Sequence, residues 1–259
     1  MSNGSADGHD RGNGHRETMP LQPGRRQYVK FTFFKLMPEW RRLDPFERER
    51  QAEEFAAVVE GWQRRNVVRC YSTVGTRGDV DFMLWHVSYE LDDVRALPAD
   101  LNGTELAGWL STPYSYLSMT KHSTYVEKYA GPGEDRATRL SLAPGDGKYL
   151  FVYPLTKLRE WYGTTAEERQ EAMNQHIAIG ATYPSVKINT TYSFGLDDPE
   201  FVLAFETDEP GDFLDLVQEL RGSVSSAYTA SDIPIFTCVA TTAGDMLRAL
   251  GLGRAAVPA

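Results

Sequence analysis

The chain has 259 residues, of which 41% are hydrophobic, 12% aromatic and 24% charged, as in a globular protein with a sizeable core. Its net charge of −9 argues against general nucleic-acid binding, and no apolar run predicts a membrane span or a secretory signal. Cys70 and Cys238 lie far apart in the sequence and form no CxxC pair, so we expect neither a disulfide framework nor a thiolate zinc site. This cysteine usage favours a cytoplasmic protein.

The first half of the chain predicts a βαββαβ unit. Residues 1–27 are polar, contain no aromatic side chain and predict a disordered tail. Residues 28–35 are rich in β-branched and aromatic side chains and predict a strand. Asp44 and Pro45 can cap and open a helix that runs to about Arg65. The remaining elements are two strands, a helix interrupted near a proline, and a last strand, at 67–75, 79–89, 92–110 and 113–125.

The second half repeats this order after a polar, turn-rich linker at 131–147. Thr164 and Glu167 form a predicted capping box that opens a helix ending near Gly180. The other predicted elements are strands at 148–156, 186–195, 200–208 and 233–241 and a helix at 213–228. We therefore expect an N-terminal unit at 28–130, a C-terminal unit at 148–245 and a C-terminal tail at 246–259.

Residues as well as elements repeat between the two halves. Tyr28 and Tyr149, Trp40 and Trp161, and Pro113 and Pro234 are each separated by 121 positions. This common offset indicates a tandem duplication. The predicted fold is α+β: two ferredoxin-like units whose antiparallel sheets bury their free faces against each other as a dimeric α/β-barrel.

Two polar groups of the second unit are candidates for chemistry. His176 is flanked on its predicted helix by Ala172 and Gly180, and an imidazole facing an open apolar space suits a haem iron. A structural histidine is the alternative. Tyr153 and Lys157 lie on the same side of their strand, and if Tyr153 points into the barrel, Lys157 does so too. A tyrosine near a cation can donate a proton or an electron, whereas an aromatic core residue with a surface lysine is the alternative.

Cations suited to carboxylates stand at Arg139 and at Arg221, which precedes a hydroxyl-rich stretch ending at Ser226. The sequence contains no P-loop, no HExxH and no GxSxG motif, so nucleotide, zinc-protease and serine-hydrolase readings have no support. A CxxCH motif is absent as well, and any haem is therefore expected to bind without a covalent link.

With its duplicated unit and the runs YPLTK, MNQHIAIG and NTTYSFGLDDPEFVLAFETD, the chain resembles the chlorite dismutase superfamily over residues 27–242, and within it most of all the coproheme decarboxylases. The resemblance implies a homopentamer with one haem-type group in the C-terminal unit of each subunit. It also implies that hydrogen peroxide drives the oxidative decarboxylation of two propionates of coproheme to give haem b, with a ferrochelatase as a candidate supplier of coproheme.

The resemblance also implies roles for individual residues. His176 matches the proximal iron ligand, Tyr153 matches the tyrosine that becomes a radical, and Lys157 matches the lysine that takes or returns the phenolic proton. Three residues match side chains that hold propionates: Arg139, Arg221 and Ser226.

Two positions depart from the family pattern. Asn189, thirteen residues after His176, stands where chlorite-decomposing members carry an arginine and is expected beside the open face of the iron. Leu155 replaces the usual methionine in the substrate pocket. Because Asn189 lacks a guanidinium charge, chlorite chemistry is disfavoured. A non-catalytic haem-binding or haem-delivery protein, and a cofactor-free barrel in which His176 is structural, stay open.

Overall fold

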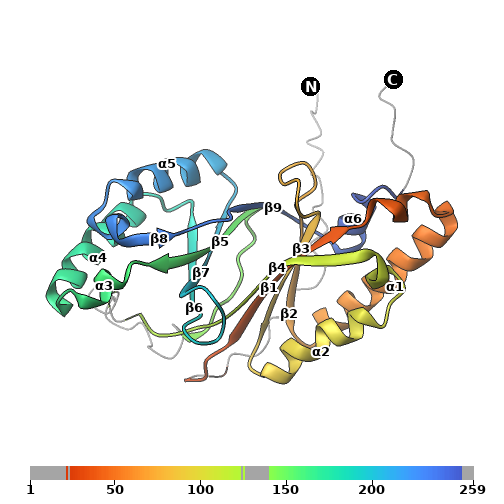
Figure 1. Ribbon diagram of the computed structural model, residues 1–259, viewed down its shortest axis with the longest axis horizontal. Helices are drawn as coiled ribbons and strands as arrows, with labels where there is room; N and C mark the ends of the chain where they lie inside the picture. Colours follow the sequence, from red (N-terminus) through yellow and green to blue (C-terminus); the bar gives the residue numbers. More distant parts are fainter. Residues whose placement is uncertain (1–21, 23, 124, 126–139, 253–259) are drawn as a thin grey trace, which may run out of the picture.

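The computed structural model describes residues 22, 24–123, 125 and 140–252. Strands from both halves of the chain form one closed, antiparallel barrel (Figure 1). Its order is β7-β6-β4-β1-β3-β2-β9-β5, and pairing of β5 with β7 closes the ring. The strands are β1 (Tyr28–Leu36), β2 (Val67–Ser72), β3 (Phe82–Ser88), β4 (Leu110–Met119), β5 (Tyr149–Lys157), β6 (Lys187–Tyr192), β7 (Phe201–Thr207), β8 (Thr229–Ser231) and β9 (Phe236–Thr241).

The two ferredoxin-like units meet at two seams of the barrel. Cys70 of β2 pairs with Thr241 of β9, and Met119 of β4 pairs with Tyr192 of β6. Alternate side chains of both sheets fill the interior, where the Phe33 and Phe236 rings stack with centroids 3.9 Å apart. The predicted duplicated α+β fold with sheets buried against each other is therefore confirmed.

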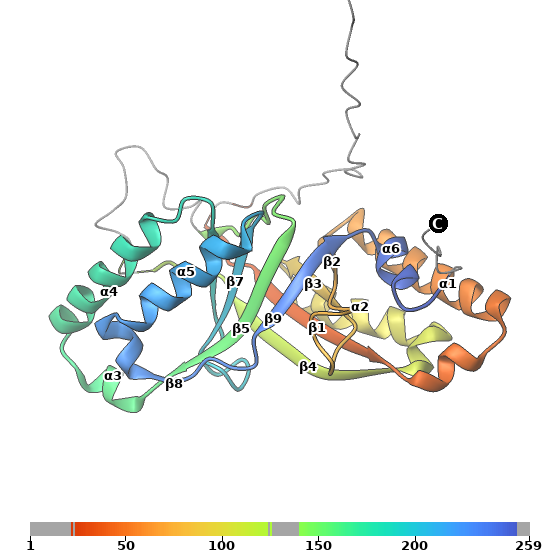
Figure 2. The same ribbon diagram turned by 90° about the horizontal axis from the view of Figure 1, so that it is seen from above.

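Helices cover the outer face of each sheet at opposite ends of the molecule (Figures 1 and 2). The N-terminal unit carries α1 (Pro45–Gln63), α2 (Leu91–Asn102) and α6 (Ala243–Arg248), and the C-terminal unit carries α3 (Arg159–Gly163), α4 (Ala166–Ala181) and α5 (Pro210–Arg221). Short 3₁₀ helices lie at Pro38–Arg42 (η1), Leu106–Trp109 (η2) and Val224–Tyr228 (η5). Within the described part of the chain, no helix is long and apolar enough to cross a membrane.

Helix starts follow the capping chemistry expected from the sequence, with one shift. The Asp44 side chain accepts a hydrogen bond from the Phe46 amide in front of α1, as predicted. The capping box of α4 uses Thr165 and Glu168 rather than the predicted pair one residue earlier. Thr164 instead ends α3, and its hydroxyl donates to the Trp161 carbonyl.

Tertiary packing moves three predicted boundaries. Gln27, placed in the tail from the sequence, is buried and its side chain accepts from the Leu142 amide, while residues 1–21 and 23 lie outside the described residues. Met246 and Leu250, also placed in a tail, are buried in the core of the N-terminal unit. The helix predicted to reach residue 228 ends at Arg221 and continues, after a short break, as η5.

Candidate functional site

The two helix–sheet layers differ sharply in how well they are filled. In the N-terminal unit, α1 buries a row of large side chains that includes Phe55, Val59 and Trp62. In the C-terminal unit, the corresponding helix α4 buries a single residue, Ala172. Since a helix in a globular protein is normally held by an apolar face packed against the core, the layer under α4 lacks part of its expected filling.

The duplication identifies the side chains that make this difference. At the offset of 121 residues, Phe55 corresponds to His176 and Val59 corresponds to Gly180. Phe55 and Val59 are completely buried in the first layer. Their counterparts are an imidazole and a hydrogen atom, so at these two positions the second layer carries less side-chain volume than the first, and one of them offers a potential metal ligand. This is the arrangement that a planar, largely apolar group with a coordinating metal requires.

His176 has the protonation state of a metal ligand. Burial and, to a smaller extent, the nearby Lys157 ammonium together lower the pKa of His176 to about 4. The imidazole is therefore neutral at pH 7 and keeps a lone pair for a metal. Its Nδ1 atom is buried and has no hydrogen-bond partner among the described residues, which is not how a satisfied structural histidine is held. The side chain fits the role of an iron ligand.

The face of β5 that lies under the helices carries Tyr153, Leu155 and Lys157. Leu150 and Val152, with the opposite parity, belong to the barrel interior. Tyr153 is buried and stacks on Phe205 with centroids 5.6 Å apart. The prediction that Tyr153 and Lys157 share one side is confirmed. That side is the helix-covered face and not the barrel interior, because the interior positions of β5 are taken by the aliphatic residues.

Lys157 is held by η5 and not by Tyr153. Its Nζ atom donates to the carbonyl oxygen of Ser225 at 2.6 Å and to the hydroxyl of the same residue at 3.1 Å, and it lies 5.0 Å from the centroid of the Trp161 ring. Burial lowers the pKa of Lys157 to about 8, against the opposing effect of Glu200. The expected exchange of a proton between Lys157 and the phenol is thus not what this geometry provides, because the ammonium is committed to Ser225.

Arg221 and Ser226 lie where α5 ends and η5 begins. The Arg221 guanidinium forms an ion pair with Asp232, a residue that the sequence analysis did not single out. Both charges act on Tyr153. Burial raises the pKa of the Tyr153 phenol well above its ordinary value, Asp232 adds to this rise, and Arg221 opposes it. Ser226 is half-buried on η5, next to the serine that holds Lys157.

Asn189 does not face this layer. It pairs with Ala204, a residue of the barrel interior, and its amide donates to the Ala204 carbonyl at 3.2 Å and to the buried Glu206 carboxylate at 2.9 Å. The expectation that Asn189 lies beside the open face of the iron is therefore contradicted by the geometry. Ile188, one residue earlier, pairs with Phe205 and lies on the helix-covered face.

Ile188 and Thr190 are the β6 residues on that face, and Ile188 reaches toward α4. Its Cδ1 atom is 3.5 Å from the position that a Cβ would take at Gly180, one turn after His176, yet Ile188 is 44% exposed. An apolar side chain this exposed beside an underfilled layer is typical of a pocket wall. Nothing in the residue type marked Ile188 from the sequence, because its direction depends on the pairing of β6 with β7.

Glu200 was also missed by the sequence analysis. It is buried and accepts hydrogen bonds from the Lys157 amide at 2.8 Å and from the Tyr162 hydroxyl at 2.6 Å, which fixes the end of β5 against α3. Leu155 lies half-buried in the same layer, and on β7 it pairs with Phe201. Arg139 lies outside the described residues.

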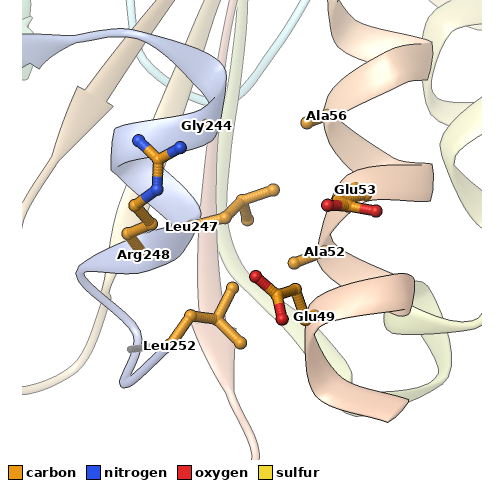
Figure 3. Close-up of a pocket in the computed structure, with 8 residues that line it drawn as sticks. All are labelled: Glu49, Ala52, Glu53, Ala56, Gly244, Leu247, Arg248 and Leu252. Carbon is orange, nitrogen blue, oxygen red and sulfur yellow. The ribbon is translucent and has the colours of Figure 1, made fainter. Parts of the chain in front are cut away.

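A separate cavity of about 140 Å³ lies between α1 and α6 (Figure 3). Small residues of α1, Ala52 and Ala56, leave it open, and Glu49 and Arg248 stand at its rim. It is well below the roughly 300–1,000 Å³ of small-molecule sites, and its rim contains no residue of the layer under α4. The underfilled layer is accordingly the better candidate site.

The chain can be compared with proteins of known family and structure. Residues 48–241 match the family model described as chlorite dismutase. The chain is 28% identical over 216 residues to a coproheme decarboxylase from Mycolicibacterium smegmatis, covering 82% of this chain and 88% of that protein. It is also 28% identical over 205 residues to a chlorite dismutase from Ideonella dechloratans, covering 78% of this chain and 71% of that protein.

Among solved structures, a haem-binding protein from Thermus thermophilus is similar with a TM-score of 0.78 and 25% sequence identity. The match covers 89% of this chain and 97% of that chain, so the two proteins share their fold over most of their length.

Proposed function

The chain belongs to the chlorite dismutase family, and on this premise we propose that it binds coproheme between α4 and the C-terminal sheet and decarboxylates two of its propionates with hydrogen peroxide. The observation that carries the proposal is the replacement of two fully buried side chains of the first unit, Phe55 and Val59, by His176 and Gly180 in the second. This exchange removes bulk and supplies a neutral imidazole at one place.

The reaction proposed for each propionate has a simple balance. One propionate, one hydrogen peroxide and one proton give one vinyl group, one carbon dioxide and two water molecules. The bound iron porphyrin, as substrate, supplies the oxidising equivalent once it has reacted with peroxide. The protein is left to hold the porphyrin, to pass one electron and one hydrogen atom through a side chain, and to keep bulk water away.

His176 is the side chain proposed to ligate the iron, and Tyr153 the one proposed to be oxidised. Tyr153 suits this role because it is buried on the sheet face that α4 covers and stacks on Phe205, and burial limits its exposure to reductants in solvent. Lys157 and Arg221 are proposed to meet propionates, each by exchanging its present oxygen partner for a substrate carboxylate.

Decarboxylation is favoured over chlorite decomposition by the sheet face opposite α4. The β6 residues on this face are Ile188 and Thr190, so β6 presents neither a guanidinium nor a side-chain amide on this face to hold an oxychlorine anion. The similarity to a coproheme decarboxylase supports the same choice. Asn189 does not contribute to this preference because it faces the barrel interior, whereas Ile188 lies on the helix-covered face.

The deciding experiment adds coproheme to the purified protein, titrates hydrogen peroxide and follows the products by mass. Loss of two carboxyl groups supports the proposal. Binding without any mass change favours a haem-binding or haem-delivery protein instead, and a chlorite-dependent release of oxygen favours a chlorite dismutase. Absence of binding to both coproheme and haem b refutes all three haem-dependent functions and leaves a barrel in which His176 is structural.

The wider setting follows from the same premise. We propose a homopentamer that works in the cytoplasm and receives coproheme from a ferrochelatase. Light scattering at several protein concentrations tests the assembly, and transfer of coproheme from a loaded ferrochelatase, followed by its absorption spectrum, tests the supplier.

A further inference from the structure

The segment that follows β8 brings a carboxylate to Tyr153. Val152 of β5 pairs with Phe236 of β9, and Thr156 of β5 pairs with Ser231 of β8. The chain between these two pairs, residues 232–235, must therefore run beside residues 153–155. Asp232 is the only ionisable residue of that short segment.

Asp232 is held so that one oxygen is committed and the other is not. Its Oδ2 atom forms the ion pair with Nη2 of Arg221. Its Oδ1 atom accepts no hydrogen bond from the described residues. The side chain of Asp232 is 17% exposed, against 49% for Arg221, so the carboxylate sits on the inner side of the pair.

Tyr153 cannot lose its proton to water easily, nor to Lys157. Tyr153 is 6% exposed, and Lys157 is bound to Ser225 through Nζ. One-electron oxidation of a phenol releases its proton at once, so a buried tyrosine that acts as an electron donor needs a nearby acceptor. The charges that act on Tyr153 are those of Asp232 and Arg221.

We propose that Asp232 is the acceptor of the Tyr153 proton and, through its ion pair, the group that holds Arg221 in reserve for a substrate propionate. This inference rests on the proposed decarboxylation. In the oxidation step the phenol O–H bond breaks, the electron passes to the peroxide-oxidised porphyrin, and the proton passes to Oδ1 of Asp232.

The remaining steps close the balance. The phenoxyl radical takes a hydrogen atom from the propionate β-carbon and becomes a phenol again. The propionate radical gives its second electron to the porphyrin and loses carbon dioxide as the vinyl group forms. The proton on Asp232, with one more from solvent, is consumed as the peroxide oxygens leave as water. Tyr153 and Asp232 thus both return to their starting states.

The proposal predicts opposite effects of one substitution on binding and on turnover. Asp232→Asn removes a negative charge beside an anionic substrate and frees Arg221, so coproheme should bind about tenfold more tightly. The same change removes the proton acceptor, so decarboxylation of bound coproheme should be at least about tenfold slower, at the low end of what a positioned proton-transfer group contributes. Asp232→Glu should restore most of the rate.

A measurement on the apo protein separates this inference from the proposed function. Tyrosine is oxidised with a photogenerated ruthenium(III) complex, and the tyrosyl signal is followed by electron paramagnetic resonance in the wild type, Asp232→Asn and Tyr153→Phe. The signal lost in Tyr153→Phe is that of Tyr153, and we expect it to form several-fold more slowly in Asp232→Asn. Equal rates in wild type and Asp232→Asn would overturn the proton-acceptor role.

The combined outcomes leave each idea separately testable. If the wild type does not decarboxylate coproheme, the proposed function fails, while the tyrosyl measurement still judges Asp232. If Asp232→Asn binds coproheme more weakly, Asp232 serves to position Arg221 for binding, and its role as a reserve for that charge is refuted. If binding tightens but turnover is unchanged, the proton passes elsewhere and the inference is overturned.

Discussion

Replacing His176 by phenylalanine tests the central idea that the layer under α4 is an unfilled copy of the layer under α1. The variant restores the side chain that the duplicated position, Phe55, carries in the N-terminal unit. We expect His176→Phe to make the apo protein more stable while it abolishes iron-porphyrin binding. Ordinary core substitutions do the reverse, since most of them destabilise.

The expected gain follows from two contributions. Burial of a phenylalanine side chain is worth roughly 1.5–3 kcal/mol when the space is filled well. Removal of a buried polar nitrogen without a partner, here Nδ1 of His176, relieves a cost of about 1–3 kcal/mol. Allowing for incomplete filling of a site shaped for a larger group, we expect an increase of about 1–3 kcal/mol in the free energy of unfolding.

The assay is urea denaturation of the apo protein followed by tryptophan fluorescence, together with a coproheme titration followed in the Soret region. The reciprocal variant Phe55→His is the matched control. It should lose about 1–3 kcal/mol, because it puts a smaller ring with unpartnered polar nitrogens into a completely buried position. If His176→Phe were instead destabilised by overpacking, or still ligated iron normally, the layer would already be full and the reasoning from the duplication would be wrong.

Three further predictions concern Tyr153, the two candidate residues of β6 and the protonation of His176. Tyr153→Phe should bind coproheme with unchanged affinity but decarboxylate it at least about 100-fold more slowly by mass spectrometry, and an unchanged rate would remove Tyr153 from the chemistry. Ile188→Gln should tighten fluoride binding to the ferric porphyrin complex, because it adds a hydrogen-bond donor to the sheet face under α4. Asn189→Ala should leave fluoride affinity unchanged and lower the free energy of unfolding by about 1–3 kcal/mol, because it removes a buried hydrogen-bond partner of Glu206. The opposite pattern would place Asn189 in the pocket. The pKa of His176 in the folded protein is about 4, below its ordinary value of 6.5, so the unfolded chain binds the proton first as pH falls. The free energy of unfolding of the apo protein should therefore fall as pH drops from about 6.5 to about 4. Chemical denaturation across that range should show a smaller fall in His176→Phe than in the wild type.

The chain and its proposed substrate are both negatively charged. The chain carries a net charge of −9, while coproheme brings four carboxylates. The cations described in the layer, Lys157 and Arg221, are each bound to oxygen atoms of the protein in this structure. If coproheme binds as proposed, it exchanges one set of charge-assisted hydrogen bonds for another, and its affinity depends on the difference between them.

Much of the fold follows from local patterns. The βαββαβ order could be read twice because strands alternate, helices are capped and turns carry glycine, and these are properties of neighbouring residues. The offset of 121 residues then joined the two halves into one architecture. Strand parity also placed Tyr153 and Lys157 on one face without knowledge of any partner, since side chains alternate along every strand.

What the sequence could not supply was the surroundings of each side chain. Asn189 and Ile188 exchange faces if the register of β6 slips by one residue, and the register is set by its pairing with β7 and not by spacing from His176. The segment that contains Asp232 runs beside Tyr153 because β8 and β9 both pair with β5, although the two residues are 79 positions apart in the sequence.

The types of side chain that we propose for the chemistry were thus readable from the sequence by itself: a histidine beside small residues, a tyrosine four residues before a lysine, and an arginine before a run of serines. The tertiary structure decided which of them meet. It turned Asn189 into the barrel, bound Lys157 to Ser225 and paired Arg221 with Asp232. The physical reason is that hydrogen bonds and ion pairs act over a few ångströms in space, and only the closed barrel brings distant strands within that range.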